Sequence, residues 1–426
     1  MQIHVVQQGE TIEAIAEAYG ISLEFLLRDN EISITTKLVV GQCLVVAIPL
    51  ETYIVQMGDT VEKIAETHNI TLMQLYRNNP FLLDREFIYP GEPLVIRYDN
   101  TLGNMTIHAN AFPFIDDKVL RKTLPYLTYL SVINYTATKE GEVISYYDDT
   151  ELISKIKGFG VMPLMLLTTL TLQGSANIGI AYDLLLNEDF QNKQIQNIIN
   201  ILSTKGYYGL NISLQYINIS TFRAYEGYLS NIFRSLNNAG FYLFVTISPG
   251  INVINNNVMI EQVNYSIINQ LAHNIIFMSY EWSTNINPPS PITSITNINL
   301  FIDYINSIIT PEKVIIGIPT VGYDWQLPFV AGISDIRLLS YNSTIDLARN
   351  VNATIQFDEI SQTPYFIYYD GGIQHIVWFI DARSINSLLN IARENRLLGS
   401  GIWNIMNYNA QLWIIVNSQY EIVKIL

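Results

Sequence analysis

Residues 208–216, YGLNISLQY, alternate apolar and polar side chains along the length of one β-strand. Successive side chains of a strand point to opposite faces, so the apolar positions 210, 212 and 214 share one face. The other face carries Asn211, Ser213 and Gln215. This pattern predicts a strand whose apolar face packs against helices and whose polar face points into the interior of a barrel.

From about residue 105, apolar runs alternate with helical segments, which is typical of βα units and a parallel sheet. The candidate strands are Met105–Phe112, Tyr129–Thr136, Val161–Thr168, Gly209–Tyr216, Phe241–Pro249, Asn274–Trp282, Val314–Trp325 and Gly401–Tyr408. Eight such units in roughly 320 residues predict an α/β fold, a (β/α)8 TIM barrel over residues 104–426. Short β-like pieces and one helix predict a small α+β insertion at about 326–376.

The first hundred residues contain a repeat. Residues 4–22 (HVVQQGETIEAIAEAYGIS) align with residues 53–71 (YIVQMGDTVEKIAETHNIT), and residues 26–30 (LLRDN) align with residues 75–79 (LYRNN). Each copy reads as strand, helix, helix, strand, with Thr11 and Thr60 as N-caps. Self-similarity at a fixed period indicates two copies of one small module, over residues 1–48 and 51–98.

Both copies resemble LysM domains in the GET or GDT turn, the following Ile-Ala helix, the L-x-x-x-N run and the glycine-led closing strand. The resemblance implies binding to N-acetylglucosamine-containing chains such as peptidoglycan or chitin. The groove residues that it implies are Gly9, Glu10, Thr11 and Asn30 in the first copy, and Gly58, Asp59, Thr60 and Asn79 in the second. The alternative is that the glycines and threonines serve only as turn and cap residues.

The stretch at 208–216 resembles the signature of family 18 glycoside hydrolases, D-G-x-D-x-D-x-E, with amides and a hydroxyl at the acidic positions. Residues 119–130 (VLRKTLPYLTYL), 278–282 (MSYEW), 317–325 (GIPTVGYDW) and 377–384 (VWFIDARS) resemble spore cortex-lytic N-acetylglucosaminidases of the germination type. Those proteins carry LysM repeats ahead of a family 18 barrel, so the resemblance spans essentially the whole chain in the same domain order.

In that family a glutamic acid protonates the leaving oxygen, and the N-acetyl carbonyl of the substrate attacks the anomeric carbon. An aspartate and a tyrosine hold the acetamide. By position, the acid falls on Gln215, the aspartate on Ser213 and the tyrosine on Tyr280, which alone is retained. Neither an amide nor a hydroxyl delivers a proton at neutral pH. The resemblance therefore implies a degenerate catalytic motif at Asn211, Ser213 and Gln215.

Other residues at predicted strand ends suit a sugar. Trp282, Trp325 and Trp403 can stack indole faces on sugar rings, with core packing as the alternative for the first two. Trp403 resembles the tryptophan that forms the floor of the sugar pocket in this family. Glu281 and Asp324 belong to motifs that the resembling enzymes have in addition to their acid. We expect them to bind sugar hydroxyls or to hold loops rather than to replace the acid.

The composition limits the classes of binding partner and indicates the compartment in which the chain is synthesised. The 426 residues carry 38 acidic and 23 basic side chains, a net charge of −15, which argues against nucleic acid or an anionic membrane as partner. No cofactor fingerprint and no metal-ligand spacing is present, so we expect no cofactor and no metal. The single cysteine and the absence of a visible signal peptide predict synthesis in the mother-cell cytoplasm, followed by deposition on the spore coat or cortex.

Three functions follow from these features. The first is an inert or nearly inert glycosidase-like protein of the spore envelope that binds N-acetylglucosamine-containing glycan or serves as a coat or assembly component, with self-assembly or coat proteins as further partners. The second is an active N-acetylglucosaminidase that hydrolyses cortex peptidoglycan during germination. The third is an assembly protein that binds no sugar. The lost acids favour the first, and the intact domain order supports the second.

Overall fold

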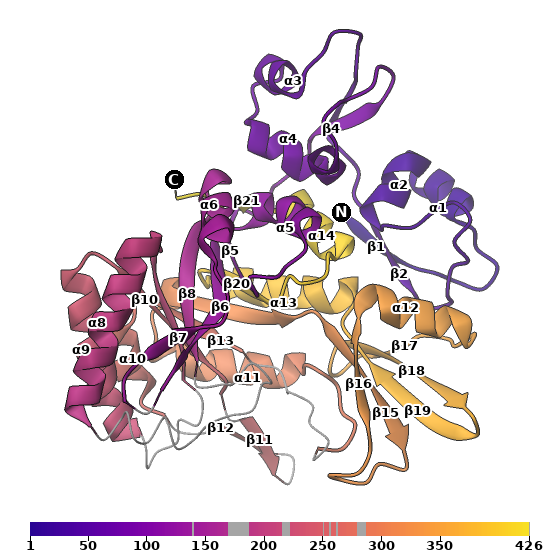
Figure 1. Ribbon diagram of the computed structural model, residues 1–426. Coiled ribbons are helices and arrows are strands. Elements are labelled where there is room, and N and C mark those ends of the chain that lie inside the picture. The colour runs from indigo at the N-terminus through magenta and orange to yellow at the C-terminus, as the bar shows by residue number, and fades with distance from the viewer. Residues whose placement is uncertain are drawn as a thin grey trace.

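The computed structural model describes residues 1–138, 140–168, 187–214, 222–249, 251–254, 257–260, 263–278 and 287–425. Figure 1 shows a barrel, with two small N-terminal modules lying together on one side of it and a separate antiparallel sheet beside it. No helix in the described part of the chain is both long enough and apolar enough to cross a membrane.

The two modules have the predicted strand, helix, helix, strand order. The first consists of β1 (Gln2–Val5), α1 (Ile12–Tyr19), α2 (Leu23–Asp29) and β2 (Cys43–Val46), and the second of β3 (Glu51–Ile54), α3 (Val61–Thr67), α4 (Leu72–Asn78), η1 (Pro80–Asp84) and β4 (Pro93–Arg97). The two strands of each module pair antiparallel. The predicted N-caps are confirmed, since Thr11 Oγ1 accepts from the Ala14 amide at 3.3 Å and Thr60 Oγ1 from the Lys63 amide at 3.2 Å.

The predicted barrel is confirmed over the described residues. Its parallel strands are β5 (Asn104–Ala111), β6 (Tyr129–Ala137), β8 (Met162–Thr168), β9 (Gly209–Leu214), β10 (Tyr242–Ile247), β13 (Asn274–Phe277), β14 (Val314–Pro319) and β20 (Gly399–Trp403). Neighbours in the chain are neighbours in the sheet, and β5 pairs with both β6 and β20, which closes the barrel. Their carboxyl ends therefore meet at one mouth, where barrel enzymes place their sites.

Helices cover the outside of the barrel, where the outward faces of strands such as β9 carry apolar side chains, among them Leu210 and Ile212. The helices are α5 (Asp117–Thr123), η2 (Leu124–Tyr126), α6 (Thr150–Gly158), α8 (Glu188–Lys205), α9 (Phe222–Asn238), α10 (Tyr265–Leu271), α11 (Ile295–Asn306), η3 (Pro311–Lys313), α13 (Ala382–Glu394) and α14 (Ala410–Gln419). Short strands β7 (Val143–Ser145), β11 (Ile251–Ile254), β12 (Asn257–Ile260) and β21 (Glu421–Ile422) complete this part.

The insertion begins earlier than predicted. Val314–Trp325 is not one barrel strand, because the barrel ladder ends at Pro319 and the chain enters a second sheet at Val321. Thr320, between the two, donates its hydroxyl to the carbonyls of Trp403 and Asn404. The insertion contains β15 (Val321–Leu327), β16 (Ile336–Ser340), α12 (Tyr341–Asn350), β17 (Gln356–Asp358), β18 (Thr363–Asp370) and β19 (Ile373–Trp378), with sheet order β16-β15-β19-β18-β17.

Both modules contact α14, the helix near the end of the chain (Figure 1). Gln411 donates from Nε2 to Asn30 Oδ1 at 3.0 Å and to the Cys43 carbonyl at 2.8 Å, which ties the first module to this helix. Arg77 of the second module, 4% exposed, donates from Nε to Asn417 Oδ1 at 2.8 Å. Helix α14 is buried on nearly every side, so the modules are part of one packed body with the barrel.

Candidate functional site

Asn211 lies on the inner face of β9, as the alternation of residues 208–216 predicts. Its side chain is fully buried and donates from Nδ2 to Ser131 Oγ on β6 at 3.0 Å. Thr246 on β10 donates its hydroxyl to Asn211 Oδ1 at 2.8 Å. The amide therefore bridges two other strands across the barrel interior, in a position that suits a neutral side chain with both a donor and an acceptor.

The network continues to a neutral histidine. Ser131 Oγ lies 2.8 Å from Nε2 of His108 on β5, and burial lowers the pKa of His108 to about 3. His108 Nδ1 is buried without a hydrogen-bond partner in the described part of the chain. An imidazole with so low a pKa is neutral at pH 7, so it has no imidazolium proton to donate as a general acid. The described network thus holds uncharged groups beneath the barrel mouth.

Ser213 lies one step closer to the mouth than Asn211. It is partly buried and pairs with Thr246 in the β9–β10 ladder. Its hydroxyl stands where the resemblance places an aspartate. Gln215, Tyr280, Glu281 and Trp282, the other predicted residues of this mouth, lie outside the described residues.

Asp324 and Trp325 do not lie at the end of a barrel strand, where the sequence places them. Both are on β15 of the insertion. The Asp324 carboxylate accepts from Arg337, from Tyr368 Oη at 2.8 Å and from His375 Nδ1 at 2.9 Å, and is 1% exposed. Trp325 has no exposed surface. These side chains stabilise the sheet of the insertion, in agreement with the structural alternatives that the sequence left open for both.

Trp403 ends β20 at the mouth and is partly buried, with its following peptide bond in the cis form. On the neighbouring strand β5, the chain continues into a small group of aromatic rings that sequence reasoning missed. Phe112 stacks on Phe114 at 5.2 Å between ring centroids, and Phe114 contacts Tyr147 at 5.4 Å. Phe114 is 57% exposed and Tyr147 43%. The aromatic residues directly after a barrel strand were the signal that could have identified them.

The acidic residues of the two module turns have the same role in both copies. Glu10 accepts from the Gln7 amide at 2.7 Å and contacts His4 Nε2 at 2.8 Å. Asp59 accepts from the Gln56 amide at 2.8 Å and from Tyr53 Oη at 2.7 Å. The backbone hydrogen bond lowers the pKa of Glu10, and the tyrosine hydrogen bond lowers that of Asp59.

Around those acids, the turns are open to solvent. Gly9 and Gly58 have φ angles of 85° and 89°, a region that favours glycine, and both are exposed, as are Thr11 and Thr60. These turns leave exposed surface for a ligand while their acidic side chains stabilise the loop.

Asn30 and Asn79 have a structural role within their modules, whatever further contact they make with a glycan. Asn30 Nδ2 donates to the Leu26 and Val45 carbonyls, each at 2.9 Å, and its Oδ1 accepts from the Val45 amide. Asn79 makes the same three bonds with Leu75 and Val95. Both are at most 5% exposed, because the amide joins the end of the second helix to the closing strand.

Comparison with known proteins agrees with this arrangement. The profile of Glycosyl hydrolases family 18 matches residues 166–407. A cortical fragment-lytic enzyme of Bacillus subtilis (strain 168) is 31% identical over 431 residues, covering 100% of this chain and 99% of that protein. The chain belongs to glycosyl hydrolase family 18.

The two modules of this family 18 chain also match a known domain family, and the whole chain resembles solved structures. The LysM domain profile matches residues 4–47 and 53–97. The crystal structure of the Bacillus megaterium QM B1551 spore cortex-lytic enzyme SleL has a TM-score of 0.81 at 25% identity, covering 100% of this chain and 99% of that one. The crystal structure of the Bacillus cereus spore cortex-lytic enzyme SleL has a TM-score of 0.80 at 27% identity, covering 99% of this chain and 98% of that one. The similarity therefore includes the placement of both LysM modules.

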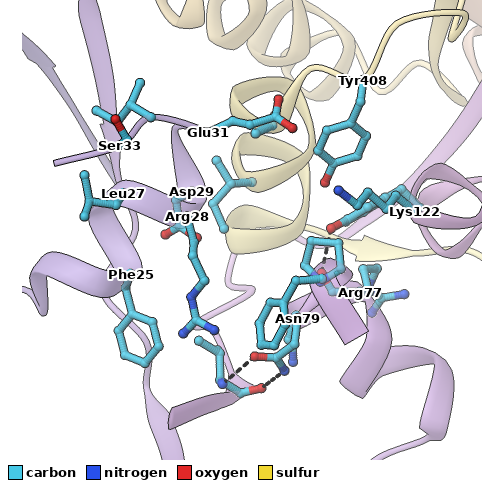
Figure 2. A pocket seen from close by; sticks show the side chains of 18 residues that line it. Phe25, Leu27, Arg28, Asp29, Glu31, Ser33, Arg77, Asn79, Lys122 and Tyr408 are labelled. Carbon is cyan, nitrogen blue, oxygen red and sulfur yellow. Dashed lines mark hydrogen bonds between the residues drawn. The ribbon is translucent and has the colours of Figure 1, made fainter. Parts of the chain in front are cut away.

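The structure contains a cavity between the LysM modules and the family 18 barrel, which the sequence analysis did not predict. Its volume is about 430 Å³, and it is lined by residues of α2, of α4 and η1, and of the barrel (Figure 2). Sequence reasoning could not find it, because its walls come from three segments that are distant in the chain.

Proposed function

We propose that this chain is a spore-envelope protein that engages the glycan of cortex peptidoglycan through N-acetylglucosamine-containing units. The observation that carries the proposal is the two LysM modules packed on a family 18 barrel, in the arrangement of the spore cortex-lytic enzymes over the whole chain. The exposed turns at Gly9–Thr11 and Gly58–Thr60 and the half-buried Trp403 at the barrel mouth are the surfaces that we assign to the glycan.

Hydrolysis is the activity that the relatives support. Proteins aligned over the whole chain carry the name cortical fragment-lytic enzyme, at 31% identity in Bacillus subtilis and 29% in Bacillus anthracis. In the first form of the proposal, the chain is therefore an N-acetylglucosaminidase that cleaves cortex peptidoglycan during germination. Its acid would then come from a carboxylate other than residue 215.

The chemistry of positions 211–215 supports binding with little turnover. A positioned general acid contributes about 10²–10⁴ in rate, and electrostatic stabilisation of the developing charge contributes about 10²–10³. The chain has Gln215 and Ser213 at those two positions. Loss of both terms lowers the rate by about 10⁴–10⁷. A glutamine keeps the shape of glutamate and its hydrogen-bonding oxygen, so glycan binding persists.

Release of reducing sugar from purified cortex fragments distinguishes an active hydrolase from a protein that binds glycan with little turnover. The full chain is compared with the Ser213→Asp/Gln215→Glu double variant and with a family relative that has the glutamate. Ser203→Asp/Gln196→Glu, on the exposed face of α8, is the control because it makes the same substitutions away from the barrel mouth.

If the wild-type chain is nearly inactive and the double variant gains at least about 100-fold, the chain binds glycan and its site lacks only the acids. A wild-type rate equal to that of the relative establishes the hydrolase instead. Failure of the chain to sediment with insoluble peptidoglycan would overturn the proposal as a whole and leave a purely structural assembly protein.

A further inference from the structure

The cavity between the two LysM modules and the barrel has walls from all three. The first module contributes Phe25, Arg28 and Asp29 of α2 and the loop after it, the second contributes residues 77–81, and the barrel contributes Lys122, Tyr408 and Ile414. Figure 2 shows the side chains of the first module on one side of the space, with Lys122 and Tyr408 opposite. At about 430 Å³, the cavity lies within the range of roughly 300–1,000 Å³ typical of small-molecule pockets.

The internal repeat reveals which wall residues lack partners. Arg77 and Asn78 of the second module align with Arg28 and Asp29 of the first. Asn78 uses its whole amide, since Nδ2 donates to the Ile96 carbonyl at 2.7 Å and Oδ1 accepts from Asn417 at 2.8 Å. Arg77 is held by Asn417 and by Glu421. In the second module, the side chains of Arg77 and Asn78 therefore hold the module on the barrel.

The same pair in the first module faces the cavity. Asp29 Oδ2 is shielded from solvent and has no hydrogen-bond partner in the described part of the chain. Arg28 lies near the faces of Phe25 and Phe81, at 5.0 and 4.4 Å from the ring centroids, and donates to the Pro93 carbonyl at 3.1 Å. A shielded polar atom without a partner costs free energy, and because Asp29 lines the cavity, its carboxyl recovers that energy by turning towards a matching group of a ligand there.

The charges around the cavity favour a neutral ligand. Arg77 of the wall is paired with Glu421 at 3.3 Å, Lys122 with Asp84 at 2.7 Å and Arg28 with Glu24 at 3.7 Å, so these three cations are already compensated. Burial raises the pKa of Asp29 to about 8, so at neutral pH it is mainly a carboxylic acid that both donates and accepts a hydrogen bond. Apolar surface from Leu27, Ile32 and the ring of Tyr408 in the cavity wall complements the CH faces of a sugar ring.

We propose that this cavity is a separate sugar site that receives one end of a neutral N-acetylhexosamine strand, with Asp29 hydrogen-bonded to the acetamide or a ring hydroxyl. It differs from the module turns at Gly9–Thr11 and Gly58–Thr60. The identity of the sugar rests on the proposed function, whereas the location rests on the cavity and on Asp29. A strand bound here contacts both modules and the barrel at once, so it stabilises their junction.

Methyl NMR of the full chain tests the site, with tri-N-acetylchitotriose as probe and the methyl groups of Leu27, Ile32 and Ile414 as reporters in the cavity wall. We expect these resonances to shift on titration. Asp29→Leu, which removes the hydrogen bond, should weaken binding at the cavity by at least about tenfold. Asp29→Asn keeps a donor and an acceptor and should bind within about threefold of wild type. Glu17→Leu, on the exposed face of the neighbouring helix α1, is the matched control.

A second variant tests the site independently, in case substitution of Asp29 impairs folding. Ser33→Trp places a large side chain at the exposed rim of the cavity and should block the same shifts without touching the carboxyl. Unshifted cavity methyls in wild type overturn the inference, as does equal binding by wild type, Asp29→Leu and Ser33→Trp.

Co-sedimentation with insoluble peptidoglycan, run in parallel, separates this inference from the proposed function. Sedimentation with unshifted cavity methyls removes the cavity site and leaves glycan engagement intact. Shifted cavity methyls without sedimentation support the cavity site and overturn engagement of peptidoglycan.

Discussion

Arg77 of the second LysM module donates from Nε to Oδ1 of Asn417 at 2.8 Å, although 340 positions separate the two residues. The guanidinium is 4% exposed, and it also contacts Glu421 at 3.3 Å. Burial of a charged group is unfavourable unless it is hydrogen-bonded. This contact therefore fixes where the module sits on helix α14, and it places the neighbouring η1 segment at the junction cavity.

Asn417→Ala should destabilise the protein at this junction. A hydrogen bond to a charged group contributes about 1.5–3 kcal/mol, and we expect that loss in the free energy of unfolding measured by urea denaturation. The control is Glu24→Ala, which removes an exposed pair with Arg28 at 3.7 Å and should cost less than about 1 kcal/mol. Equal effects of the two variants would show that the Arg77 contact contributes no more than a surface pair.

Asn211→Ala should lower stability even though residue 211 lies in the stretch that resembles the family 18 signature. The change removes the bond to Ser131 and leaves the Thr246 hydroxyl without its acceptor inside a fully buried network. We expect a loss of about 2–3 kcal/mol in urea denaturation. Ser203→Ala on exposed α8 should change stability by less than about 0.5 kcal/mol. An unchanged midpoint for Asn211→Ala would mean that the network is not structural.

Asp29→Asn should change how stability depends on pH. The pKa of Asp29 is about 8 in the folded chain against an ordinary value of 3.8, because burial disfavours its charged form. Its contribution to stability is therefore fully present below about pH 4 and is lost as the pH rises through about 8. The asparagine does not titrate. The melting temperature of the variant relative to wild type should rise between pH 5 and pH 8.5, and a constant difference across that range would contradict the raised pKa.

Substitutions of Trp403 and Trp325 should have different effects, the first on sugar binding and the second on packing of the insertion. Trp403→Ala removes a half-buried ring at the barrel mouth and should weaken binding of tri-N-acetylchitotriose, measured by isothermal titration, by about tenfold. Trp325→Phe alters a side chain with no exposed surface in the insertion, so it should lower the melting temperature and leave the affinity unchanged. Matching losses of affinity in both variants would place Trp325 in the sugar site after all.

Local pattern predicted the barrel strands well and failed at one of them. The run 314–325 is largely apolar apart from Thr320 and Asp324, and its apolar pattern does not show that residues 314–319 and 321–327 belong to two sheets. The break depends on the Thr320 hydroxyl and on carbonyls at Trp403 and Asn404, some eighty positions away. Asp324 and Trp325 were misplaced for this reason alone.

The sequence by itself determined the two repeated modules, the closed parallel barrel and the absence of carboxylates at positions 211, 213 and 215. Each of these depends on residue type at short, regular spacing, which the chain carries locally. Only the tertiary structure decided that Asp29 lines a cavity with Oδ2 lacking a partner in the described residues, while the equivalent Asn78 is bonded to Asn417 of the barrel. The two residues stand at the same position of one motif, and what distinguishes them is which distant segment folds against each.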